Sequence, residues 1–175
     1  AALEQTAQTA LEQTLNKLPI AKMMHYQVQQ KNGQLADVQF ARPAHRIIAL
    51  HGSKLLNISA LGIDAGNQTE GHRFLASGSV SITHADRYES DLETKAKIVP
   101  NFNKRRAQIE TALLKAAGND LVLMPDSLLD EVTALVEWPA IYECHFDQEF
   151  LEVPQECLIL TMQTNQKRSE EHTSE

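Results

Sequence analysis

Aromatic residues are scarce in this sequence, and cysteine is scarcer still. Phe, Trp and Tyr make up only 5% of the 175 residues, so a core has to be built from Leu, Ile, Val and Ala. The two cysteines, Cys144 and Cys157, cannot form a disulfide framework and lack the paired spacing of a zinc site. We therefore predict that both pack as small hydrophobic side chains.

The sequence also lacks a long apolar run. No segment approaches the roughly 18 apolar residues that a membrane-spanning helix needs, which excludes an integral membrane helix. The first residues include Glu4 and Glu12 and show no basic segment followed by an apolar one, so we expect no secretory signal peptide. The expected location is cytoplasmic.

An excess of basic residues is absent as well. Lys and Arg number 16 against 23 Asp and Glu, a net charge of −7, whereas a compact nucleic-acid-binding module shows the opposite balance. Hydrophobic residues are 42% and charged residues 22%, as in ordinary globular domains. A role with nucleic acid would require a local basic patch or a larger assembly.

Periodicity and turn signals predict a mixture of helices and strands. Pro19 ends the first amphipathic helix, and Asn32-Gly33 marks a hairpin turn. Because helices and strands do not alternate regularly, we predict an α+β fold with a mixed or antiparallel sheet and packed helices. The expected helices are 2–17, 85–98, 102–117, one that begins at Pro125-Asp126-Ser127, and a helix-like turn at 154–162; the expected strands are 25–31, 36–41, 46–51, 54–62, 72–75 and 138–146.

The last eight residues, 168–175, differ from everything before them. They are wholly polar and without periodicity, and they resemble the translation of a sequencing-adapter oligonucleotide. We predict that residues 1–167 carry the fold and that 168–175 is a non-native, disordered tail.

Histidines offer little support for metal or acid–base chemistry. His45 and His51 have an even spacing that would place them on one face of a strand, but no carboxylate accompanies them at ligand spacing. His145 and Asp147 form a constellation of only two groups. We assign no catalytic residue and no metal ligand.

The segment Gly71-His72-Arg73-Phe74 combines a permissive backbone with cationic groups. A sharp turn at the glycine would let His72 and Arg73 meet a phosphate or a carboxylate. In the alternative interpretation, Arg73 pairs with a nearby acid of the protein and Phe74 fills the core.

Lys104, Arg105 and Arg106 form the densest basic run. On a helix these side chains could contact an RNA backbone, where each cation contributes through counterion release. A solvated helix face is the alternative. The candidate RNA-binding residues are therefore Lys104, Arg105, Arg106 and Arg73.

The order of the short motifs along the chain is more specific than any one of them. The succession resembles the β subunit of the bacterial two-subunit glycyl-tRNA synthetase over nearly all of residues 10–167. The motifs are Lys17 to Met24 (KLPIAKMM), Phe40 to His45 (FARPAH), Leu61 to Ile63 (LGI), Gly71 to Phe74 (GHRF), Ala85 to Tyr88 (ADRY), Lys95 to Val99 (KAKIV), Asp130 to Pro139 (DEVTALVEWP), Phe150 to Pro154 (FLEVP), and Thr161-Met162 with Gln166-Lys167.

This resemblance implies an α2β2 glycine–tRNA ligase. In that family the α subunit uses ATP and Mg²⁺ to form glycyl adenylate, while the β subunit binds tRNA(Gly) and is needed for transfer. The chain would be an N-terminal-region fragment without the HD-like and anticodon-binding parts, and with no cofactor of its own. Its fold is expected to be similar to the B3/B4-type module of phenylalanyl-tRNA synthetase β chains. The alternative is a non-catalytic α+β module that binds RNA or protein.

Overall fold

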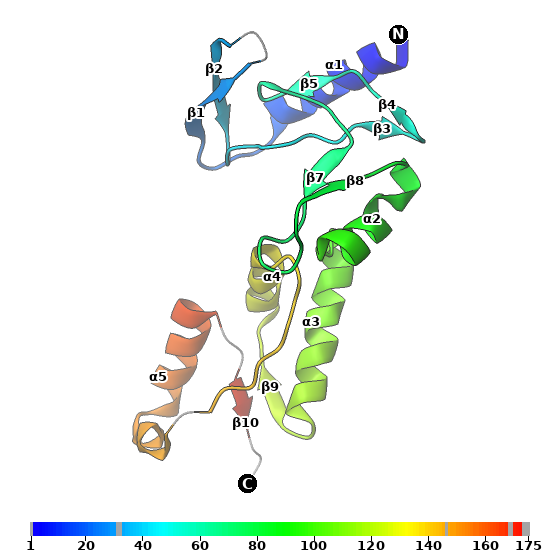
Figure 1. Cartoon of the computed structure of the whole chain (residues 1–175). Helices are drawn as coiled ribbons and strands as arrows, with labels where there is room; N and C mark the ends of the chain where they lie inside the picture. Colours follow the sequence, from blue (N-terminus) through cyan, green and yellow to red (C-terminus); the bar gives the residue numbers. More distant parts are fainter. Residues whose placement is uncertain (1, 31–32, 146, 168–169, 173–175) are drawn as a thin grey trace. The chain divides into compact units, whose positions relative to one another are not determined.

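The computed structural model describes residues 2–30, 33–145, 147–167 and 170–172. The chain forms two compact units, residues 1–96 and residues 97–175. Figure 1 labels most of the helices and strands of both units, and its colours follow the sequence. None of the helices in the described ranges has the length and apolar character that a bilayer crossing requires.

The first unit begins with a helix and a hairpin, as predicted. Helix α1 (Ala2–Lys17) is followed by strands β1 (Met24–Gln29) and β2 (Leu35–Phe40), which pair antiparallel. The register runs from Met24 opposite Phe40 to Gln29 opposite Leu35, and Gly33 has a positive φ of 80° in the turn. Asn32, the other residue of the predicted turn signal, lies outside the described residues.

The remaining strands of this unit form three short antiparallel ladders. Each ladder has two strands, and one parallel bridge joins Ile48 to Gly66. The ladders pair β3 (Leu50–His51) with β4 (Lys54–Leu55), β5 (Ser59–Ala60) with β6 (Ile63–Asp64), and β7 (Gln68–Glu70) with β8 (Ser79–Ser81). The α+β class is thus confirmed, but the described residues form separate two-stranded ladders and no single larger sheet.

The predicted strands 46–51 and 54–62 are too long. Positive φ values at Gly52, Leu61 and Gly62 turn the chain sharply, so only two-residue stretches keep a paired extended backbone. The strand predicted at 72–75 is wrong. There the His72 carbonyl accepts hydrogen bonds from the backbone N–H groups of Leu75 and Ala76, which makes a turn.

The helix predicted at 85–98 is present but changes type along its length. It consists of a 3₁₀ turn η1 (Ala85–Arg87), α2 (Tyr88–Asp91) and a π turn η2 (Leu92–Ala96). His84 Nδ1 accepts a hydrogen bond from the Asp86 N–H at 3.2 Å and so caps the start. The core of the first unit is formed by Val38, Ala49, Leu56, Val80, Ile82, Leu92 and Ala96.

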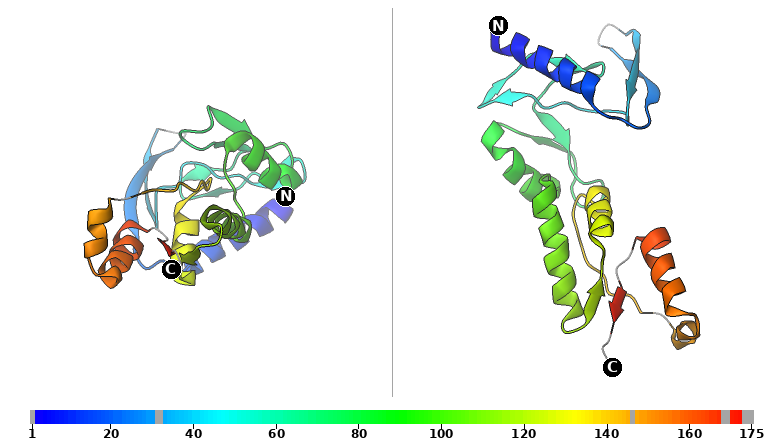
Figure 2. Two further views of the ribbon diagram at one scale, coloured as in Figure 1. Left: turned by 90° about the horizontal axis from the view of Figure 1, so that it is seen from below. Right: turned by 180° about the vertical axis from the view of Figure 1, so that it is seen from behind.

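The second unit is built on two packed helices (Figure 2). Helix α3 (Phe102–Ala117) has the predicted bounds and ends at Gly118, which has a φ of 62°. Strand β9 (Leu121–Leu123) and the predicted helix α4 (Asp126–Leu135) follow. The buried residues of this unit include Val99, Ile109, Ala117, Leu128, Leu129 and Thr133.

The strand predicted at 138–146 is wrong for its described residues. Residues 138–145 are irregular, Phe146 lies outside the described residues, and Tyr142 is 83% exposed. The likeness to a strand came from local β propensity, but no described strand pairs with this segment. Further on come a 3₁₀ turn η3 (Gln148–Glu152), the expected helix α5 (Gln155–Leu160) and a π turn η4 (Thr161–Asn165).

Part of the segment 168–175, for which disorder stays a prediction, has extended backbone next to β9. Residues Glu170–His172 form strand β10, which pairs antiparallel with β9, Glu170 opposite Leu123. A short strand edge such as β9 presents unpaired backbone N–H and C=O groups that an adjacent extended segment can satisfy. The other residues of the segment lie outside the described ranges. The non-native origin of this segment stays a prediction.

Candidate RNA-contact site

The basic run lies at the beginning of α3, where the helix cap fixes its position. Asn101 is the N-cap residue, and its side-chain oxygen accepts a hydrogen bond from the backbone N–H of Lys104 at 3.1 Å. The run therefore occupies the first turns of a regular helix. Lys104 is exposed, whereas Arg105 and Arg106 are half-buried.

Arg105 binds backbone carbonyl groups of its own unit. Its Nε donates to the Thr133 carbonyl at 2.9 Å, and its Nη1 donates to the Val99 carbonyl. The guanidinium carbon also lies 5.8 Å from the centroid of the Phe102 ring. The Arg105 guanidinium thus joins the start of α3 to α4 and to the segment before α3.

Arg106 binds carboxylates. Its Nη2 lies 2.7 Å from Asp126 Oδ1 and its Nε 2.7 Å from Asp130 Oδ1, both on α4. Glu110 lies one turn along α3, and its Oε2 is 3.8 Å from Arg106 Nη1. The hydrogen bond with Asp130, followed by that with Asp126, raises the pKa of Arg106 above its ordinary value against the opposing effect of burial.

These interactions give the two arginines a role in holding the second unit together. The charge of Arg106 is compensated by neighbouring carboxylates, which lowers the net positive potential that an RNA phosphate would meet there. RNA contact by Lys104, Arg105 and Arg106 stays a prediction.

Arg73, the fourth candidate, lies on a tight turn of the first unit. The His72 N–H donates to the Ala96 carbonyl at 2.7 Å, and the Phe74 N–H donates to His72 Nδ1 at 3.2 Å. A Cβ on Gly71 would lie 2.7 Å from the Cβ of Ala76, so only glycine fits this packing without movement. The described residues contain no hydrogen-bonding or ion-pair partner for the exposed Arg73 side chain.

Phe74 does not fill the core. Its side chain is 85% exposed, and its ring lies 6.2 Å from the His72 ring, centroid to centroid. Both parts of the alternative interpretation of this segment, an intramolecular acid for Arg73 and a buried Phe74, are therefore wrong for the described residues. The turn presents a cation and an aromatic ring to its surroundings.

Sequence reasoning missed a buried carboxylate in α2. The side chain of Asp91 is 2% exposed, and its Oδ1 lies 2.9 Å from Lys95 Nζ and 3.6 Å from Arg87 Nη2. Its Oδ2 is buried and has no partner among the described residues. The spacing of Arg87, Asp91 and Lys95 at intervals of four was a usable signal, because such residues are neighbours on a helix.

Within the described part of the chain, the histidines and cysteines do not assemble into a metal site. No group of three or more His, Cys, Asp or Glu side chains in the described ranges lies close enough together to hold a metal ion. His145 Nε2 lies 3.4 Å from Glu143 Oε1, on an exposed segment. Cys144 and Cys157 are both exposed, so their predicted packing as small hydrophobic side chains is wrong.

Comparison with known proteins gives one consistent result. The family profile described as glycyl-tRNA synthetase β subunit matches residues 1–170. A glycine–tRNA ligase β subunit from Ralstonia nicotianae is 53% identical over 167 residues, which covers 95% of this chain and 23% of the relative. Such subunits from Neisseria gonorrhoeae and Polaromonas naphthalenivorans are 47% and 46% identical, over 90% and 95% of this chain.

These matches define a class, the subunits of an aminoacyl-tRNA synthetase. Within it, the chain belongs to the family of glycyl-tRNA synthetase β subunits, as the order of its motifs indicates. The chain spans about a quarter of the length of the curated relatives that it matches.

Proposed function

We propose that this chain is part of the β subunit of a glycine–tRNA ligase and supports the ATP-dependent attachment of glycine to tRNA(Gly). Its contribution is tRNA binding and assembly with a catalytic α subunit in an α2β2 enzyme. The observation that carries the proposal is the match of the family profile to residues 1–170, together with 53% identity to a ligase β subunit over nearly the whole chain.

The local chemistry is compatible with a supporting role. Arg106 of α3 is paired with Asp126 and Asp130 of α4, and Asp91 is paired with Lys95 and Arg87. The turn that carries Arg73 and Phe74 offers a guanidinium for a phosphate and a ring on which a base could stack. ATP and Mg²⁺ would be bound by the α subunit.

Reconstitution tests this proposal. The full-length parent β subunit is assayed for charging of tRNA(Gly) with radiolabelled glycine, alone and with the α subunit added. We expect charging only when both subunits are present. Charging by the β subunit alone would contradict the proposal, and so would an equal rate from the α subunit with and without β.

A further inference from the structure

The charges of the chain are divided unequally between its two units. Residues 1–96 contain nine acidic and nine basic residues and are neutral overall, whereas residues 97–175 contain fourteen acidic and seven basic residues, a net −7. The basic run of α3 therefore belongs to the acidic unit. A polyanion such as RNA is repelled on average by the second unit and not by the first.

The middle of the first unit's sequence has an excess of basic residues. Residues 13–84 contain seven Lys and Arg against three Asp and Glu, and the remaining acids of the unit lie before and after this stretch. Two of the seven cations are paired: Arg46 lies 3.3 Å from Glu70, and Lys54 lies 3.7 Å from Glu4. Lys31 lies outside the described residues.

The other four cations have no hydrogen bond or ion pair with a described residue. They are Lys17, Lys22, Arg42 and Arg73, and each is exposed. Exposed cations of this kind add little to the stability of a fold. They are the groups that can replace the counterions of a nucleic-acid backbone.

Two of these cations are brought to one end of the hairpin by the fold. Lys22 lies in the short linker between α1, which ends at Lys17, and β1. The register that sets Met24 opposite Phe40 places Lys22, two residues before Met24, and Arg42, two residues after Phe40, at the same open end of the ladder. We name Lys22 and Arg42 the hairpin-base cluster.

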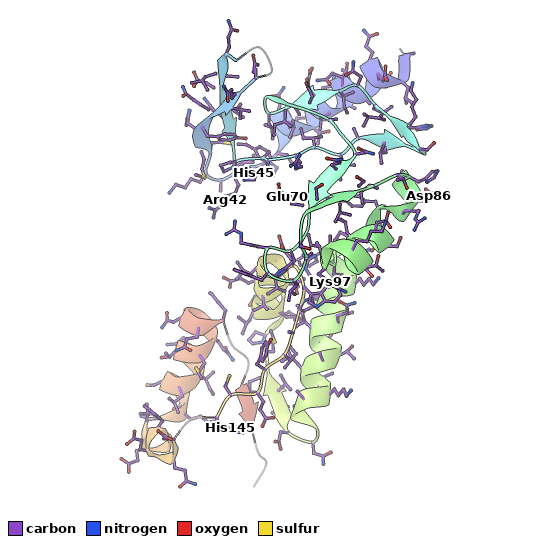
Figure 3. The ribbon with its side chains drawn as sticks, viewed as in Figure 1. Arg42, His45, Glu70, Asp86, Lys97 and His145 are labelled. Carbon is purple, nitrogen blue, oxygen red and sulfur yellow. The ribbon has the colours of Figure 1, made fainter. Side chains whose placement is uncertain are left out.

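A further interaction fixes the segment that carries Arg42. The backbone N–H of Ala44 donates to the Tyr26 hydroxyl at 3.3 Å, which ties the segment after β2 to strand β1. Figure 3 labels Arg42 and His45 on this segment, where it leaves the hairpin. The strand pairing and this hydrogen bond therefore hold the chain next to the cluster.

We propose that the hairpin-base cluster binds the phosphate backbone of RNA, and that it does so more strongly than the basic run of α3. The inference rests on the proposed function, which supplies tRNA as the polyanion. The surface that it names differs from the run Lys104 to Arg106, where Lys and Arg residues are densest in the sequence. Unpaired charge, and not the local number of Lys and Arg residues, selects that surface.

The test uses the reconstituted α2β2 enzyme with the full-length parent β subunit. The affinity for tRNA(Gly) is measured over a series of salt concentrations for the wild type and for a β subunit carrying Lys22→Ala and Arg42→Ala. Removal of one phosphate-binding cation reduces the slope of log affinity against log salt by about one, so we expect a reduction of about two. Affinity at low salt should fall, and it should converge with the wild-type affinity at high salt.

Two single variants serve as controls. Arg46→Ala removes a cation from the same segment, but one that is already paired with Glu70. Lys104→Ala removes the exposed cation of the basic run of α3, in the acidic unit. Neither should change the slope by more than a small fraction of the effect of the double variant. Circular dichroism and size-exclusion chromatography confirm folding and assembly.

The outcomes separate this inference from the proposed function. A wild-type enzyme that binds tRNA with a steep salt dependence, together with an unchanged slope in the double variant, overturns the inference and leaves the proposed function standing. A double variant that folds but no longer assembles with the α subunit shows a protein interface and also overturns it. A wild-type enzyme without measurable tRNA affinity contradicts the proposed function itself.

Discussion

Arg105 and Arg106 are adjacent in sequence, yet their guanidinium groups satisfy different partners. Arg105 donates to the carbonyl groups of Val99 and Thr133, and Arg106 donates to Asp126 and Asp130. A planar guanidinium with several N–H donors suits both tasks. Replacement of either residue should therefore affect the packing of α3 against α4.

We predict that Arg106→Ala lowers the stability of the second unit. Asp126, Asp130 and Glu110 would then face one another without their shared cation, which adds repulsion to the loss of hydrogen bonds. The urea midpoint of unfolding should fall, and Arg106→Lys should restore it only in part because lysine lacks the fork geometry. An Arg106→Ala midpoint equal to that of Lys115→Ala, an exposed position on the same helix, would contradict this role.

The pH dependence of this contribution has a definite sign. The pKa of Arg106 is raised in the folded protein, mainly by the hydrogen bond with Asp130. A raised folded-state pKa gives stability that is fully present below the unfolded-state value and is lost only as pH rises through the folded-state value. Deprotonation of Arg106 should therefore cause no loss of stability between about pH 6 and about pH 9.

A second prediction concerns the tight turn at Gly71. A Cβ there would lie 2.7 Å from Ala76 Cβ and 3.0 Å from the Ala96 carbonyl oxygen, so Gly71→Ala forces the turn or η2 to move. We expect a loss of about 1–3 kcal/mol in the free energy of unfolding. Urea denaturation measures it. The matched control is Gly66→Ala, whose nearest neighbouring atom would be 3.9 Å away; equal effects of the two substitutions would rule out the steric explanation.

At the scale of single residues, prediction from the sequence was limited by distant partners. Arg106 takes its carboxylates from α4, twenty and twenty-four positions further along the chain. Nothing in the local run distinguishes such a paired arginine from a free one. The exposure of Phe74 was likewise unpredictable, because a large aromatic side chain is more often buried than exposed.

Helix α3 shows how strongly a local signal can determine an element. Asn101 is its N-cap and Gly118 its C-cap, so the residues that set both boundaries lie immediately next to the helix. The cap also sets the position of Lys104, because the Asn101 side-chain oxygen accepts a hydrogen bond from the Lys104 backbone N–H. The same local logic gives α1, α4 and the β1–β2 hairpin their predicted places.

The third prediction concerns this cap. Asn101→Ala leaves the Lys104 N–H without its side-chain acceptor and should cost about 1 kcal/mol in the free energy of unfolding. Asn101→Asp should retain most of the stability, because its carboxylate accepts the same hydrogen bond and suits the positive end of the helix dipole. Urea denaturation compares the three proteins. An aspartate variant as unstable as the alanine variant would exclude a capping role.

Strands were predicted less well than helices for a physical reason. A helix closes its hydrogen bonds within its own sequence, whereas a strand needs a partner elsewhere. Residues 138–145 have strand-like composition but no described partner, while Leu121–Leu123 pairs with Glu170–His172 and was not predicted. The two-residue ladders of the first unit are set by turns with positive φ and not by long alternating patterns.

For the whole molecule, charge and family membership give different information. The overall net charge of −7 conceals a neutral first unit and an acidic second one. The division could be counted from the sequence only once the unit boundary was known. Membership of the glycyl-tRNA synthetase β subunit family, in contrast, was predictable from the order of the motifs alone.

We expect this chain to perform the supporting function of the region of a ligase β subunit with which it aligns. A chimera tests it most directly. The region of the Ralstonia nicotianae β subunit that aligns with this chain, 53% identical, is replaced by residues 1–167, and the chimera is assembled with the Ralstonia α subunit. Size-exclusion chromatography confirms that the tetramer forms before the assay.

Glycine charging of tRNA is then compared with that of the unmodified enzyme. We predict that the assembled chimera charges tRNA(Gly) with a kcat/KM within about tenfold of the parent, a difference of about 1.4 kcal/mol in transition-state stabilisation. A tetramer that assembles normally and forms glycyl adenylate, but transfers no glycine to tRNA, would contradict the claim.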